Sequence, residues 1–348
     1  MHKLFDFINK PLGFILQFIA EMLGGSFAAA VFVFTLLINV ALIPLSIKSQ
    51  KSSVQQTRIK PKLDELKKKY GDDKQAYSQA MQKLYQEENV SMSGGCLPMI
   101  LRLVLMMSIY TLIMSPLTYM TGVDSAKITN VNNAITSSMT ELKKKDENAY
   151  NNYKKELNWQ EGRSNDLSIV GIIRDKDGIP TIKELLKDDY SKIEKDLEEI
   201  KRKDDEVKIN YTFITKKLDL TQSPKFSFNI FEDAQLIWVM PLLAFASQIL
   251  TSWLSMRMQK KINPDAPNMA GMMYMMPLIS LFIGFALPGG VTFYWACSSL
   301  IGGFIQIGVQ NFYGPHKMLS RERSKELMRQ CDFEAGQISK NIKNLNQP

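Results

Sequence analysis

The feature that most constrains this chain is a series of long apolar segments with almost no charge. A bilayer core about 30 Å thick is crossed by a helix of roughly 20 mostly apolar residues. Segments that reach this length without a charged residue are 24–47, 234–256, 268–287 and 288–313. Segment 96–119 also reaches it, apart from Arg102. The alternative, buried helices in a large soluble domain, does not account for five such segments. We therefore expect an all-α integral membrane protein with five transmembrane helices.

The charged segments between these spans predict their orientation. Segment 48–95 has ten Lys or Arg residues against six Asp or Glu, and its basic residues gather close behind the first span. The short segment 257–267 and the tail 314–348 also carry basic residues near the membrane. Short basic segments beside a span stay in the cytoplasm. Five spans then place the N-terminus outside the cell and the C-terminus in the cytoplasm.

The long polar segment 120–233 is accordingly expected outside, because segments of this length cross the membrane largely regardless of charge. Apolar residues within Thr181–Lys208 recur at helical spacing and predict an amphipathic helix. Asn130–Asn152 shows a weaker pattern, and we expect it to be mobile. The segment as a whole is predicted to be a polar, largely helical insert.

The first 23 residues form a segment of a different kind. Their apolar residues can share one helix face, but four charged residues interrupt any spanning run. An amphipathic helix that lies in the outer membrane interface, hinged at Gly24-Gly25, accounts for this pattern. A cleaved signal peptide is the alternative, although no A-x-A-like cleavage site stands out.

Segment 48–95 has the pattern of two antiparallel helices. Ile59, Leu63 and Leu66 give the first helix a narrow apolar stripe. Gly71-Asp72-Asp73 interrupts it, and an aspartate there can cap the helix that follows. We predict a cytoplasmic helical hairpin with a highly charged surface.

The residues that most enzymes and metal sites use are sparse. The three cysteines lie far apart without a CxxC spacing, and the two histidines stand near opposite ends of the chain. Neither a disulfide framework, a metal cluster nor a Ser/His/Asp triad is suggested. Phosphate-binding and dinucleotide-binding glycine motifs are also absent from the sequence. The sequence therefore predicts a protein that is not an enzyme.

A series of short motifs resembles the YidC family, the bacterial branch of the Oxa-type insertases. In chain order they are Thr35-x-x-x-Asn39-x-x-x-x-Pro44-Leu45, Lys60-Pro61-Lys62-Leu63, Tyr70-Gly71-Asp72-Asp73-Lys74-Gln75, Gly94-Gly95-Cys96-Leu97-Pro98 and Pro288-Gly289-Gly290-x-x-x-Tyr294-Trp295. Their order and spacing agree over 24–312 apart from the insert. The resemblance implies a five-span bundle with a cytoplasmic hairpin and no cofactor.

The chain departs from the family's pattern in one dipeptide and at two single positions. The family usually has Asn-Pro ahead of the second span, where this chain has Ser91-Met92. The family's signature arginine belongs at the position of Asn39, and a glutamine belongs at the position of Arg102. The resemblance therefore implies that the positive charge has moved from one helix to its neighbour.

The depth of these residues in their spans supports such an exchange. At 1.5 Å per residue, Asn39 lies ~12 Å and Arg102 ~9 Å from the cytoplasmic end of its span. Gln248 and Gln306 fall at similar depths. Polar side chains within a membrane usually face the bundle interior or a watery cavity. We therefore predict that Arg102, Asn39, Gln248 and Gln306 line a hydrated groove that opens to the cytoplasm.

Simpler interpretations of the same residues stay open. Arg102 can extend to the headgroups without any further role. The side-chain amides of Asn39, Gln248 and Gln306 can form hydrogen bonds between helices, and such bonds in membranes average about 0.6 kcal/mol each. Gln248 and Gln306 suit that role as well as a groove.

The function predicted from this pattern is that of a membrane protein insertase or chaperone. Its expected partners are nascent membrane proteins and the lipid bilayer of the bacterial cell membrane, with the ribosome and the Sec translocon as further candidates. No contact with nucleic acid is required, and one copy is expected to suffice. One alternative is a small-anion transporter or channel, but this sequence shows no internal repeat of the kind that transporters usually contain. The other alternative is an integral-membrane enzyme.

Overall fold

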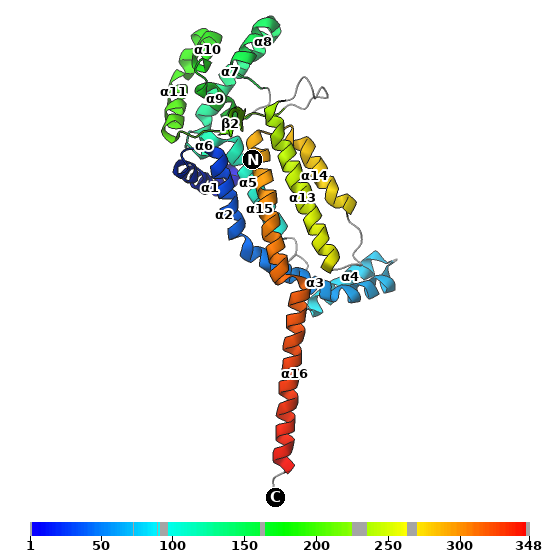
Figure 1. Cartoon of the computed structure of the whole chain (residues 1–348). Helices are drawn as coiled ribbons and strands as arrows, with labels where there is room; N and C mark the ends of the chain where they lie inside the picture. The colour runs from blue at the N-terminus through cyan, green and yellow to red at the C-terminus, as the bar shows by residue number, and fades with distance from the viewer. Residues whose placement is uncertain are drawn as a thin grey trace. The chain divides into compact units, whose positions relative to one another are not determined.

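In the residues that it describes, the computed structural model is almost entirely helical, with one two-stranded sheet (Figure 1). It describes residues 2–71, 73–88, 90, 97–160, 164–224, 235–262 and 270–345, without the side chains of some of them, Arg102 included. The chain forms two compact units. The first consists of Met1–Ile38, Leu103–Ser252 and Met269–Ile301, and the second of Asn39–Arg102, Trp253–Asn268 and Gly302–Pro348.

A helix occupies each predicted span. These helices are α2 (Phe27–Ala41), α5 (Leu97–Met114), α13 (Val239–Ile262), α14 (Ala270–Gly284) and α15 (Gly289–Tyr313). Within the described residues, Leu236–Met258 and Gly289–Tyr313 are long and apolar enough to cross a membrane. The pair Phe27–Ala41 and Ile43–Gln50, bent by 43°, is a third candidate if it counts as one span. Val104–Met114 and Tyr274–Gly284 are shorter apolar helices. The structure thus supports two or three spans, and five remains a prediction.

Helix α1 (His2–Met22) forms where the sequence predicts an amphipathic helix. One face is buried through Leu16, Ile19 and Ala20. Gly13 permits the close approach of α1 to α6 (Pro116–Tyr119), since a Cβ there would lie 2.4 Å from the Tyr119 carbonyl oxygen. Shortly after the helix ends, Gly24 and Gly25 have φ angles of +68° and +82°, a conformation that favours glycine. The chain therefore turns at the predicted hinge.

Among its described residues, the predicted insert contains five α-helices with a shared apolar core. They are α7 (Ser125–Lys145), α8 (Glu147–Glu156), α9 (Asn165–Arg174), α10 (Gly178–Leu186) and α11 (Tyr190–Val207). The prediction for Thr181–Lys208 is largely confirmed, although the helix is interrupted at Lys187, which has a φ of +50°. The expectation for Asn130–Asn152 is wrong, because α7 buries Val131, Ile135 and Met139 in the core. Its Asn, Ser and Thr residues, which are weak helix formers, obscured that stripe.

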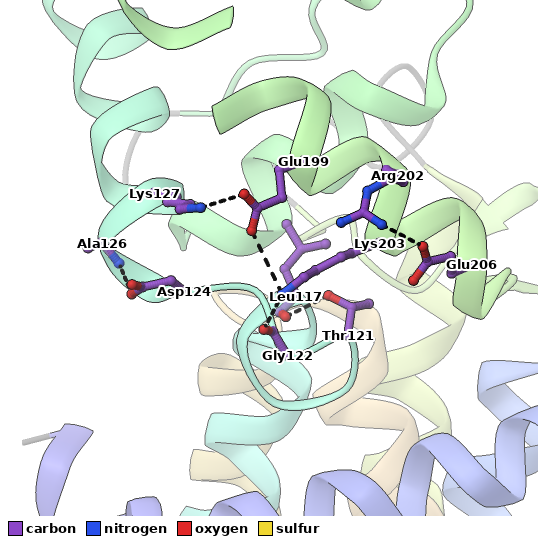
Figure 2. A network of polar contacts seen from close by, with 10 residues as sticks. All are labelled: Leu117, Thr121, Gly122, Asp124, Ala126, Lys127, Glu199, Arg202, Lys203 and Glu206. Atoms are coloured by element: carbon purple, nitrogen blue, oxygen red, sulfur yellow. Dashed lines mark hydrogen bonds and ion pairs between the residues drawn. The ribbon is translucent and has the colours of Figure 1, made fainter. Parts of the chain in front are cut away.

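A network of polar contacts fastens α11 to the start of α7 (Figure 2). Lys203 Nζ donates to the carbonyl oxygen of Gly122 at 2.8 Å, and Lys127 pairs with Glu199. Asp124 caps α7 by accepting a hydrogen bond from the Ala126 amide at 2.9 Å. The Lys127–Glu199 ion pair is partly exposed, and exposed ion pairs contribute little to stability because water and salt screen them. The joint effect of these contacts is to hold the loop that precedes α7.

A more buried ion pair joins α9 to the end of α11. Arg174 Nε and Nη2 donate to the two carboxylate oxygens of Asp204 at 2.8 and 2.6 Å, and Nη1 donates to the Ile209 carbonyl oxygen. The guanidinium lies 4.6 Å from the centre of the Tyr211 ring. Burial is the largest single effect on the pKa of Arg174 and lowers it, but the hydrogen bonds to Asp204 and the electrostatic attraction of Tyr211, Asp204 and Asp219 together outweigh burial and raise this pKa. This pair positions the segment that follows α11.

That segment, residues 208–222, contains the antiparallel strands β1 (Thr212–Phe213) and β2 (Thr215–Asp219). The Asn210 carbonyl oxygen accepts from the Phe27 amide at 3.0 Å, at the start of α2. The Leu220 carbonyl oxygen accepts from the Gly290 amide at 2.7 Å, at the start of α15. The first amides of a helix have no partner within the helix, so this segment, which we call the capping segment, satisfies amides of two apolar helices.

In the second unit, α3 (Ile43–Tyr70) and α4 (Lys74–Glu87) lie side by side (Figure 1). Asp73 caps α4, as predicted, by accepting from the amides of Gln75 and Ala76. Glu88 pairs with Arg58 at 3.0 Å and with Lys62, so the end of α4 is tied to the middle of α3. Helix α3 runs without a break through the expected boundary between residues 47 and 48. The unit also contains α16 (Pro315–Leu345).

Candidate functional site

Asn39 lies two residues before the end of α2, and its side chain is half-buried in the second unit. It lies close to α15 at Gly302, where an added Cβ would be 3.1 Å from Asn39 Oδ1. That separation is shorter than ordinary van der Waals contact. Glycine at this position therefore allows the Asn39 amide to lie directly against the backbone of α15.

Gln306 lies four residues beyond Gly302, which is about one helical turn on the same side of α15. Its side chain is half-buried. Asn39 and Gln306 thus stand on neighbouring helices of the second unit, next to the same close approach. Among the predicted groove residues, Asn39 and Gln306 are the two that the described part of the structure brings close to each other.

Arg102 is the sixth residue of α5, and its backbone is helical. Its side chain lies outside the described residues. The predicted position of the cation is therefore an expectation from the sequence alone.

Gln248 belongs to the first unit, where it joins two apolar helices. Its Oε1 accepts a hydrogen bond from Ser280 Oγ of α14 at 2.7 Å. One turn further along α13, Thr251 Oγ1 lies 3.1 Å from Ser299 Oγ of α15. Gln248 therefore forms one of the interhelical hydrogen bonds that the sequence left open as an alternative.

The hydroxyl residues Ser280, Thr251 and Ser299 were missed by the sequence analysis. A hydroxyl in an apolar helix usually bonds to the carbonyl oxygen one turn back, as Thr35 Oγ1 does to Val31 at 2.6 Å. A serine or threonine in an apolar helix therefore does not by itself predict a contact with another helix. The one indication in the sequence was the position of Thr251, which follows Gln248 by three residues and so lies on the same helix face.

No set of three His, Cys, Asp or Glu side chains within the described ranges is arranged to hold a metal ion. The candidate residues are amides, hydroxyls and one arginine. They can donate and accept hydrogen bonds, and the arginine can attract an anion. Within the second unit, the amides of Asn39 and Gln306 can therefore exchange hydrogen bonds with polar groups.

Comparison with known proteins gives a family match over most of the chain and shorter matches to individual relatives. Residues 18–173 and 180–316 match the family model described as 60Kd inner membrane protein, so the match includes much of the insert. The chain is 38% identical over 109 residues to the membrane protein insertase YidC of Dinoroseobacter shibae, and 43% identical over 105 residues to that of Haemophilus ducreyi. These alignments cover 31% and 30% of this chain but only 18% and 19% of the relatives.

Proposed function

The chain belongs to the YidC/Oxa family, and on this premise we propose that it is a membrane protein insertase. The observation that carries the proposal is the half-buried amide of Asn39 against Gly302, one turn from Gln306, in two helices that contain no charged residue. Polar side chains are costly in hydrocarbon and usually face a bundle interior or a water-filled cavity. The family match gives no support to the alternative of a small-anion channel.

We propose that five helices cross the bacterial cell membrane, with the N-terminus outside and the C-terminus in the cytoplasm. The two long apolar helices, the bent pair and the two shorter apolar helices support this arrangement. Helix α1 then lies in the outer interface, with Phe7, Phe14, Phe18 and Met22 exposed to lipid. The α3–α4 hairpin lies in the cytoplasm, where its charged surface is solvated.

The proposed groove is lined by Asn39, Arg102, Gln248 and Gln306. Asn39 and Gln306 are supported by their place in the second unit. Arg102 and Gln248 are included because of their depth in the spans. The hydrogen bond of Gln248 to Ser280 gives this glutamine a structural role as well.

Such a groove carries out insertion without covalent chemistry. Water in the groove allows a polar substrate segment to enter the inner leaflet without complete dehydration. Two opposite charges 4 Å apart attract by ~4 kcal/mol at an effective dielectric of 20 and by ~1 kcal/mol in bulk water. The weaker value suits a site that the substrate must leave. Burial of the substrate's apolar span in lipid, at about 25 cal/mol per Å2, then drives release.

The substrates under this proposal are nascent membrane proteins, and the ribosome and the Sec translocon are proposed as further partners. One copy of the chain is proposed to be sufficient, since all the groove residues come from a single chain.

The test is complementation of an insertase-deficient bacterium, with the amount of each variant in the membrane measured in parallel. Arg102→Ala is expected to reduce insertion sharply, whereas Arg102→Lys retains much of it because a point charge is enough. Arg257→Ala is the matched control, since Arg257 is exposed at the end of α13 and stacks on Trp253 at 4.1 Å. Full activity of well-expressed Arg102→Ala would contradict a role for the cation.

The double variant Arg102→Gln with Asn39→Arg tests whether the groove needs a cation at this depth or on one particular helix. By the helical rise, the two positions differ by only ~3 Å in depth. We expect the double variant to recover function. A stable but inactive double variant would show that the helix carrying the charge matters.

A further inference from the structure

An exposed isoleucine occupies the turn between β1 and β2. Phe213 pairs with Thr215 across this turn, which leaves Ile214 at the tip. The Ile214 residue is 85% exposed and has a φ of +59°. This left-handed conformation favours glycine or asparagine and is rare for a β-branched residue. Neither burial of the side chain nor the geometry of the turn accounts for isoleucine here.

The position of the turn indicates what the side chain meets. The ring of Phe213, next to the tip, packs on Phe293 in the second turn of α15, with ring centres 4.9 Å apart. The capping segment is also hydrogen-bonded to the first residues of α2 and α15 through Asn210 and Leu220. The tip is therefore held at the level where two apolar helices begin.

Helix α1 meets the capping segment at the same level. The Asn210 amide donates to the Gly25 carbonyl oxygen at 2.7 Å, just beyond the end of α1. This helix exposes large apolar side chains along its length, including Phe18 at 55% and Met22 at 71%. Two separate elements of the first unit thus present apolar side chains next to the start of a span.

We propose that Ile214 is a membrane anchor, through which the β1–β2 turn inserts into the outer leaflet of the bilayer. The inference rests on the membrane arrangement proposed above, in which α2 and α15 begin at the outer interface. Two lysines, Lys216 and Lys217, follow the tip in the sequence. Lysines in a segment beside a membrane surface are attracted to anionic headgroups, and an apolar residue in such a segment suits the boundary between acyl chains and headgroups. The anchor fixes the depth of the insert above the spans.

The experiment uses spin labels on the full chain in vesicles of phosphatidylethanolamine and phosphatidylglycerol, with no other protein. Cysteine replaces Ile214 in a chain whose three native cysteines are changed to serine. Lys187→Cys is the matched control, because Lys187 is also exposed and has a φ of +50°. Phe282→Cys reports on α14, where the native side chain is 67% exposed. The readout is accessibility to oxygen, which concentrates in lipid, relative to a water-soluble nickel chelate.

We expect oxygen to exceed the nickel chelate several-fold at positions 214 and 282, and the reverse at position 187. If position 282 reports lipid while position 214 reports water, the anchor is wrong and the membrane arrangement stands. If position 282 also reports water, the arrangement itself is wrong. The two failures are therefore distinguishable.

A second measurement avoids the cysteine at a left-handed position. A photoreactive diazirine on a lipid tail should label the unmodified chain at Ile214 in the same vesicles. The variant Ile214→Asn, which this backbone conformation tolerates, should lose that label and keep the label on α14. If Ile214 is labelled only after a substrate or partner protein is added, the proposal that Ile214 inserts into lipid by itself is wrong.

Discussion

Replacing Arg174 by alanine should open the insert locally without unfolding the chain. The change leaves the Asp204 carboxylate, whose side chain is only 5% exposed, without its two hydrogen bonds from the guanidinium. It also removes the donor to Ile209 and the cation over the Tyr211 ring. Removing one partner of a buried pair costs about 3–5 kcal/mol. At 1.4 kcal/mol per factor of ten, local opening becomes roughly 10^2 to 4 × 10^3 times more frequent.

The assay is hydrogen exchange with mass spectrometry on the purified full-length protein. Exchange should accelerate by this factor at the end of α11 and in residues 208–211, which the pair holds in place. Arg202→Ala is the matched control, because Arg202 pairs with Glu206 on the same helix with both side chains more than 60% exposed. An exposed pair contributes up to about 1 kcal/mol, so the control should change exchange less than about fivefold.

The reasoning is refuted if Arg174→Ala and Arg202→Ala have the same small effect. A double variant gives a sharper version of the test. Arg174→Met with Asp204→Asn removes both charges and keeps most of the volume, so it should be less destabilised than Arg174→Ala alone. A double variant that opens as often as the single one would show that packing, rather than the unpaired carboxylate, sets the cost.

Further predictions concern the second unit and the orientation of the chain. Gly302→Val should displace Asn39 and lower the free energy of unfolding by about 1–3 kcal/mol through overpacking. It should also reduce insertion per molecule in the complementation assay, and activity equal to that of the native chain would contradict the close approach. Lys62 and Arg58 lower the pKa of Glu88, so these pairs are intact above the ordinary carboxyl pKa and weaken as the pH falls through the lowered value. Spin labels on α3 and α4 should separate in that acidic range, and Glu88→Gln should abolish the pH dependence. A cysteine at Thr140 should react with an impermeant reagent outside intact cells and one at Lys83 should not, while the reverse would overturn the orientation.

The composition along the chain determined which segments form the apolar helices. A run of uncharged residues is a property of neighbouring positions, so it is visible without any knowledge of the fold. The same holds for the turn at Gly24-Gly25 and for the Asp73 cap of α4, which the structure contains at the expected positions. It also holds for the polar residues Asn39 and Gln306, because a polar residue in an apolar run is conspicuous.

Other features were decided only by tertiary contacts. Gly302 is one of many glycines in the sequence, and its importance appears when α2 and α15 come together. Arg174 and Asp204 are unremarkable charges in a polar segment until folding brings them within hydrogen-bond distance. The capping segment has no helical periodicity, yet its backbone satisfies the first amides of two helices. Local patterns report the preferences of one element, whereas these interactions join residues from separate elements whose proximity depends on how the whole chain packs.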